Sequence, residues 1–157
     1  MHPDRILDEQ ELNTLRQNHE ELLGLCRNLE ELADSLPFAV NEKLCREVSD
    51  QVLPLLSRTQ EFEEQLLFPD LDRSAGSCFT AMMIERLKNE HRCDRLAAEE
   101  ISLTLKAMLR GHCGLTFETI GYMLRGVFEC VRRHVAAEKA MIDQLIPADP
   151  EPRLVLA

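Results

Sequence analysis

Long hydrophobic runs and blocks of basic residues are both missing from this sequence of 157 residues. No apolar run approaches the roughly 20 residues of a membrane-spanning helix, and the start, Met1–Arg5, lacks the basic-then-apolar pattern of a signal segment. The formal net charge is -10, so the electrostatic attraction that draws proteins to nucleic acids and anionic membranes is absent. We therefore expect a cytoplasmic protein that binds neither nucleic acid nor membrane.

Motifs of common catalytic and redox sites are missing as well. The six cysteines include no C-x-x-C pair of the kind that a zinc knuckle or a dithiol redox site uses, so we expect them to be reduced. The sequence also lacks a nucleophile–base pair, a phosphate-binding loop and a nucleotide-binding motif. It gives no positive indication of an enzyme, and any redox chemistry would belong to a bound metal.

The residues that are present favour helices. The chain has no tryptophan and only six glycines, and its Leu, Glu, Arg and Ala content is typical of helical proteins. Helix-breaking residues gather at 35–37, 69–76 and 111–114, which divides the chain into four long segments. Candidate N-terminal caps stand where the segments begin, namely Asp8 with Glu11, Asn41, Ser77 and Thr116. We predict an all-α protein, an antiparallel up-down-up-down four-helix bundle over residues 1–147, followed by a proline-containing tail at 148–157.

Each predicted helix carries an apolar stripe that polar residues interrupt in one short stretch. The apolar residues recur at alternating steps of three and four, as in helices that pack in a bundle. The interruptions are His19 in the first segment, Thr59 and Glu63 in the second, His91 and Asp94 in the third, and His134 and Glu138 in the fourth. When the segments are folded about their loops, with a rise of about 1.5 Å per residue, these positions lie within about one helical turn of a common level.

The composition of this polar layer is typical of a metal site. One buried histidine is ordinary in a protein core when it has hydrogen-bond partners. Two buried glutamates are different, because an unpaired carboxylate is costly to bury and needs a cation or strong donors nearby. Imidazole nitrogens with bridging carboxylates suit iron, manganese or zinc, and bundle cores build such sites from side chains on facing helices.

The two halves of the chain repeat this arrangement. Each predicted hairpin contributes a histidine from its first helix and a glutamate from its second. His134 precedes Glu138 by one helical turn, whereas Thr59 holds the matching position before Glu63. Two such hairpins facing each other form a nearly symmetric cage that lacks one histidine.

These residues resemble the HHE cation-binding domain of hemerythrin-like proteins. The similarity covers essentially the whole chain, in the order His19, the stretch E-E-Q-L-L-F-P at 63–69, Glu90-His91 and His134-x-x-x-Glu138. It is closest to the repair-of-iron-centres subgroup, whose di-iron site has four histidines and two bridging glutamates. The resemblance implies that iron, two ions per chain, is bound by His19, Glu63, His91, His134 and Glu138, with both glutamates bridging.

Thr59 departs from that family, which has a histidine at this position. A threonine hydroxyl is a poor iron ligand beside imidazole and carboxylate, so the departure predicts an open coordination position, a single iron, or a domain that has stopped binding metal. Asp94 is a candidate to orient an imidazole or to fill the missing coordination. An ion pair with Arg95 or Arg132 is its alternative role.

The resemblance implies a function in sensing or binding a small gaseous or peroxide ligand (oxygen, nitric oxide or peroxide), as in oxidative or nitrosative stress, or in handling iron. Two other interpretations stay open from the residues alone. One is a metal-free four-helix interaction module whose polar layer only fixes the register of the bundle, and the other is a mononuclear zinc or manganese site. We expect a monomer or a homodimer.

Overall fold

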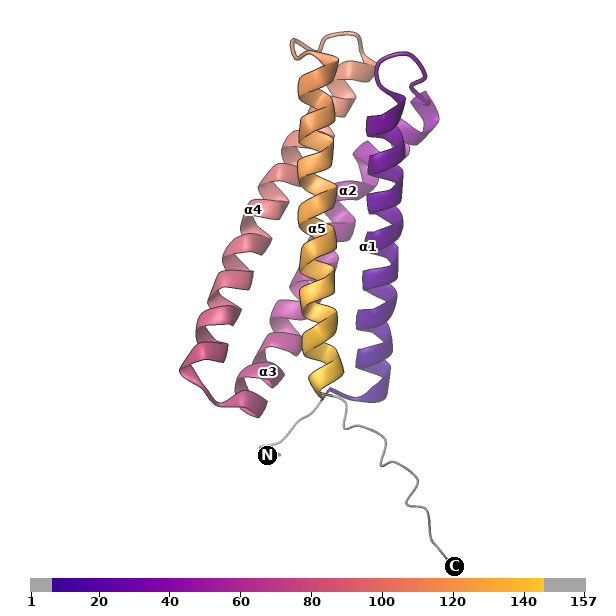
Figure 1. Cartoon of the computed structure of the whole chain (residues 1–157). Coiled ribbons are helices and arrows are strands. Elements are labelled where there is room, and N and C mark those ends of the chain that lie inside the picture. Colours follow the sequence, from indigo (N-terminus) through magenta and orange to yellow (C-terminus); the bar gives the residue numbers. More distant parts are fainter. Residues whose placement is uncertain (1–6, 146–157) are drawn as a thin grey trace, which may run out of the picture.

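The structure is a computed structural model that describes residues 7–145, and within that range every regular element is a helix. The elements are α1 (Glu9–Ser35), α2 (Glu42–Phe62), the π-helical turn η1 (Glu63–Leu67), α3 (Phe68–Ala75), α4 (Cys78–Leu109) and α5 (Phe117–Leu145). Because α2, η1 and α3 follow one another without a break, they form one arm, and the four arms run alternately up and down (Figure 1). The predicted all-α four-helix bundle is confirmed, and the tail at 148–157 lies outside the described residues.

The arms begin where the sequence places N-terminal caps. Asp8 and Glu11 form a reciprocal capping box, in which the Glu11 amide donates to Asp8 Oδ1 at 2.7 Å. Asn41, Ser77 and Thr116 each accept a hydrogen bond from the backbone amide three residues further on. These bonds satisfy amides that the first helical turn leaves without a partner, so the four starting points predicted from the sequence are confirmed.

The break predicted at residues 69–76 is wrong over most of its length. Pro69 lies in the first turn of α3, and the π turn before it allows the Phe68 amide to donate to the Glu63 carbonyl. Proline is tolerated there because the amides of a first turn need no partner within the helix. The arm ends only at Gly76, whose φ of 53° is the left-handed conformation that glycine adopts readily.

The π turn also changes which side chains face the core. A π turn holds one residue more than an α-helical turn, so the residues after it are rotated relative to an unbroken stripe. Leu67 and Phe68 are buried as a result, while Leu66, which α-helical spacing would place on the stripe, is only half-buried. Glu63 opens this turn and is itself buried.

The core consists of two apolar clusters with the polar layer between them. The larger cluster includes Leu29 and Ile101 and lies towards the loops that follow α1 and α4. The smaller cluster includes Leu15 and Phe68 and lies towards the turn between α3 and α4. α1 packs against α5 and α2, and α4 packs against the same two helices, so all four arms enclose the layer.

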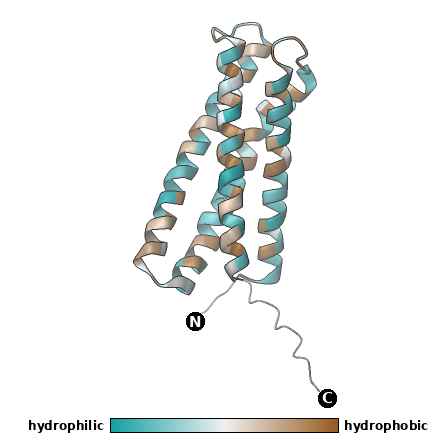
Figure 2. Cartoon of the chain, in the orientation of Figure 1, coloured by the Kyte–Doolittle hydropathy of each residue, from teal (hydrophilic) through white to brown (hydrophobic). Residues whose placement is uncertain are grey.

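Hydrophilic and hydrophobic residues share every arm, as expected for helices with one buried face (Figure 2). Charged side chains on the outside pair between neighbouring helices, for example Arg58 with Glu21 at 2.6 Å and Arg125 with Asp34 at 2.7 Å. Exposed pairs of this kind contribute little to stability. Within residues 7–145, no helix has the length and apolar character needed to cross a membrane.

Candidate metal centre

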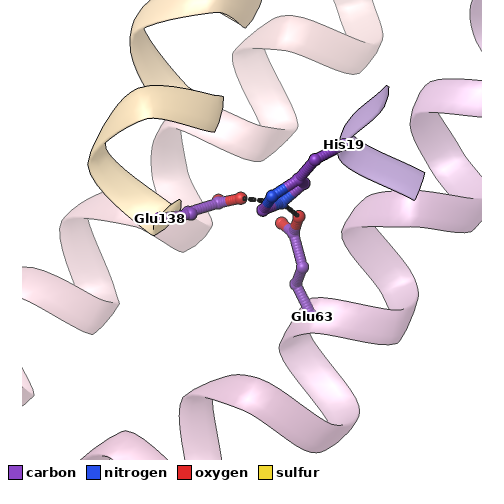
Figure 3. A group of neighbouring side chains, drawn as sticks. All are labelled: His19, Glu63 and Glu138. Carbon is purple, nitrogen blue, oxygen red and sulfur yellow. Dashed lines mark hydrogen bonds and ion pairs between the residues drawn. The ribbon is translucent and has the colours of Figure 1, made fainter. Parts of the chain in front are cut away.

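Four side chains of the predicted ligand set meet in the polar layer, one from each arm. His19 comes from α1, Glu63 from the start of η1, His91 from α4 and Glu138 from α5. All four are buried, with relative exposures of 5%, 1%, 1% and 2%, respectively. In Figure 3 the ring of His19 lies between the carboxylates of Glu63 and Glu138 and contacts both.

Each of the two carboxylates reaches both imidazoles, with one oxygen for each. Glu63 places Oε1 2.8 Å from His19 Nε2 and Oε2 3.3 Å from His91 Nε2. Glu138 places Oε2 3.2 Å from His19 Nε2 and Oε1 2.9 Å from His91 Nε2. The two glutamates therefore span the same two ring nitrogens, although they come from different arms.

This arrangement has the donor atoms and spacing of a metal site. Two ligand atoms about 2.1 Å from one ion and at right angles to each other are about 3 Å apart, close to the spacing between each imidazole nitrogen and its carboxylate oxygens. The ligand atoms of His19, Glu63 and Glu138 also lie within 4.8 Å of one another. Each carboxylate thus directs one oxygen towards each imidazole, the arrangement expected of a carboxylate that metal ions could share.

His91 is fixed from its other side. Its Nδ1 lies 3.1 Å from Glu64 Oε1, and its ring stacks on Phe68 with the centroids 5.4 Å apart. Histidines that bind metals commonly donate their second ring N–H to a carboxylate, which sets the tautomer and the ring orientation. The role of Glu64 was not predicted from the sequence. The signal available was a second glutamate directly after Glu63, on the flank of the same stripe.

His134 lies at the edge of the layer and binds two other carboxylates. Its Nδ1 is 2.5 Å from Asp94 Oδ2, and its Nε2 is 3.0 Å from Glu90 Oε2. The Glu90 side chain is 31% exposed and that of Asp94 only 9%, so the ring connects the surface to the interior. The fifth predicted ligand thus stands beside the other four, while its own contacts are with Asp94 and Glu90.

Asp94 is buried, and the expected alternative of an arginine partner is wrong. Its carboxylate accepts a hydrogen bond from Gln60 Nε2 at 3.3 Å and contacts His134. Arg95 instead donates to Gln60 Oε1 at 3.0 Å, and Arg132 pairs with a glutamate of α1. Gln60, whose role was not predicted from the sequence, therefore connects Asp94 to the second arm.

Thr59 is fully buried, but its hydroxyl is turned to its own helix. It donates to the Leu55 carbonyl at 2.9 Å, which is a common arrangement for a threonine inside a helix. The Thr59 hydroxyl therefore bonds its own backbone, whereas the corresponding residue in the other half of the bundle, His134, contacts the carboxylate of Asp94.

A small cavity lies inside the layer. Its volume is about 10 Å³, enough for one water molecule or one ion. Its polar lining consists of Gln60, Glu63, His91, Asp94, His134 and Glu138, and apolar side chains complete the wall.

The buried charges of the layer change its proton affinities. Burial and the neighbouring charge of Glu138 raise the pKa of Glu63 well above its usual value. Burial alone would also raise the pKa of Glu138, but hydrogen bonds from His19 and His91 lower it to about 2. For His19, burial opposes protonation, yet hydrogen bonds with Glu138 and Glu63 raise its pKa to about 9. Without a cation the layer therefore retains protons at neutral pH.

Comparison with known proteins gives one match. The family model described as Hemerythrin HHE cation binding domain matches residues 10–145, a range that includes every side chain of the layer. Searches of the curated proteins and of the solved structures found no match to the chain.

Proposed function

Because the chain belongs to the hemerythrin HHE cation-binding domain family, we propose that its polar layer binds a pair of non-haem iron ions. In this proposal, His19, His91 and His134 would supply nitrogen donors to the two ions, and Glu63 and Glu138 would supply carboxylate oxygens shared between them. Bound iron would supply reversible coordination or redox chemistry for a small ligand such as oxygen, nitric oxide or a peroxide. The same centre would also suit a protein that stores iron or passes it on.

The observation that carries this proposal is that Glu63 and Glu138 each contact both His19 and His91. Two carboxylates that are 1% and 2% exposed share two imidazoles, one oxygen to each ring. Two buried carboxylates repel each other, and burial of such a pair becomes favourable when a multivalent cation neutralises it. The contact of His91 Nδ1 with Glu64 adds to this support, because it holds the ring with Nε2 towards the two buried carboxylates.

A metal-free helical interaction module is the second candidate, and one observation favours it. Within residues 7–145, every fully buried side-chain nitrogen or oxygen has a hydrogen-bond partner without any metal. The layer can therefore persist as a hydrogen-bonded network that fixes the register of the four arms. The orientation of Thr59 towards Leu55 agrees with this alternative as well.

Elemental analysis of the protein purified without added metal, together with its visible absorption in air, tests the proposal. About two irons per chain with a near-ultraviolet band of bridged ferric iron would support the di-iron centre. A zinc or manganese content would point to a different metal in the same layer. No metal, even after anaerobic reconstitution with ferrous iron, would refute the proposal and leave the interaction module.

Thr59→His should strengthen binding of the second iron, because it restores the histidine that the family has at this position. Loss of a side chain that only supports a metal ligand weakens metal binding by about 10–100-fold. We therefore expect that a restored ligand makes this ion bind at least about tenfold more tightly. The measurement is iron per chain and visible absorption after anaerobic reconstitution and exposure to air.

Thr104→His is the matched control for this substitution. Thr104 is also a buried threonine whose hydroxyl donates to the carbonyl four residues back, at 2.8 Å, but it lies outside the layer. If Thr59→His changes iron content no more than Thr104→His does, the correspondence of Thr59 with the missing histidine is wrong.

Metal affinity should rise with pH. A cation must displace the proton that His19, with a pKa of about 9, holds in the metal-free protein, and the raised pKa of Glu63 acts in the same direction. Each displaced proton changes the apparent Kd by about tenfold per pH unit, so we expect at least about a tenfold fall in Kd per unit between pH 6 and 8. Competition with a chelator, using zinc as a redox-inert probe, measures this slope. An affinity independent of pH would show that neither group carries a displaceable proton.

A further inference from the structure

We propose that Asp94 is a metal ligand and that it makes the cation position beside His91 and His134 much stronger than the position beside His19. The inference rests on the proposed function, since it concerns how the same layer holds its metal. It goes further in assigning a role to a residue outside the resemblance and an order to the two binding events.

The position beside His91 has the richer set of donors. The cavity of about 10 Å³ lies against His91, His134 and Asp94 and is closed by Glu63 and Glu138. With Gln60, six side chains that carry nitrogen or oxygen atoms thus surround a space about the size of one ion. Asp94 lies three residues after His91, so both project from the same face of α4.

Asp94 is also a buried carboxylate beside this cavity. Its side chain is 9% exposed, and its partners are the amide of Gln60 at 3.3 Å and the ring of His134 at 2.5 Å. In the metal-free protein the ring of His134 can carry the positive charge that compensates this carboxylate, but a histidine that binds metal must be neutral. A cation in the adjoining cavity would replace the charge that His134 gives up.

The position beside His19 lacks both features. In the internal repeat, Thr59 corresponds to His134, and its hydroxyl donates to a backbone carbonyl. The residue three places after His19, which corresponds to Asp94, is Leu22, an apolar side chain that is 3% exposed. Only His19 and the two bridging carboxylates remain as donors on this side, so the two positions are unequal in two independent ways.

Stepwise loading with ferrous iron under anaerobic conditions tests the assignment on the full-length protein. The wild-type chain should bind one iron strongly and a second one more weakly, as measured by competition with a chromogenic chelator. Asp94→Asn, which keeps the shape and an acceptor for Gln60, should weaken the first step by at least about tenfold. His19→Ala should abolish the second step and change the first by less than about threefold.

Asp143→Asn is the matched control, because Asp143 is an exposed aspartate of α5 and the substitution removes the same charge. It should leave both steps as in the wild type. A first step in Asp94→Asn as tight as in the Asp143→Asn control would overturn the assignment, as would a His19→Ala chain that loses the first step. A wild-type chain that binds no iron would overturn the proposed function and this assignment together, whereas the other outcomes leave the proposed function standing.

Discussion

Glu138→Ala is expected to lose almost all of its bound iron while the bundle remains helical. Glu138 contacts His19 at 3.2 Å and His91 at 2.9 Å, so in the proposed centre its loss removes a donor from both cation positions at once. Loss of a group that only supports a metal ligand reduces affinity by about 10–100-fold, and loss of a shared ligand should exceed that range. Elemental analysis after anaerobic reconstitution, followed by desalting, measures the retained iron.

Glu129→Ala provides the matched control. Glu129 is an exposed glutamate on the same helix, so this variant loses the same side chain and the same charge without touching the layer. It should retain the iron content of the wild type. Retention of iron by Glu138→Ala at the level of Glu129→Ala would show that the metal, if present, is bound elsewhere.

The sequence predicts the layer well because burying a charged side chain is costly wherever it occurs. Glu63 and Glu138 stand out as carboxylates on otherwise apolar stripes, and a histidine accompanies them in each half of the chain. The helix starts can be predicted equally well, because an N-terminal cap such as Asn41 accepts its hydrogen bond from a backbone amide only three residues further on. Both signals are local or periodic, and neither depends on how the arms pack.

The π turn and the roles of Glu64 and Gln60 could not be predicted from the sequence, because the spacing of apolar residues does not show how the arms contact one another. The π turn at Glu63–Leu67 converts a predicted break at Pro69 into a continuous arm, because the wider turn and the first-turn position both tolerate a missing amide. Glu64 and Gln60 lie on the flanks of their stripe. Their roles appear only once α4 is packed beside them, with His91 against Glu64 and Asp94 against Gln60.

Replacing the four most buried histidines and glutamates of the layer by leucine should make the metal-free protein more stable. The substitutions are His19→Leu, Glu63→Leu, His91→Leu and Glu138→Leu in one chain, which joins the two apolar clusters into one core. Replacing buried ionic groups by apolar residues of similar size is commonly neutral or stabilising by about 1–4 kcal/mol. With a urea m-value of about 2 kcal/mol/M, the midpoint measured in the presence of a chelator should rise by up to about 2 M.

The single variant Glu138→Ala, measured in the same way, should shift the midpoint in the opposite direction, because it leaves His19 and His91 buried without one of their partners. Opposite signs for the two variants would mean that the four buried residues make the metal-free bundle less stable than an apolar core would, although each of them depends on its partners. A leucine variant with a lower midpoint would instead show that the hydrogen-bonded network itself stabilises the metal-free bundle.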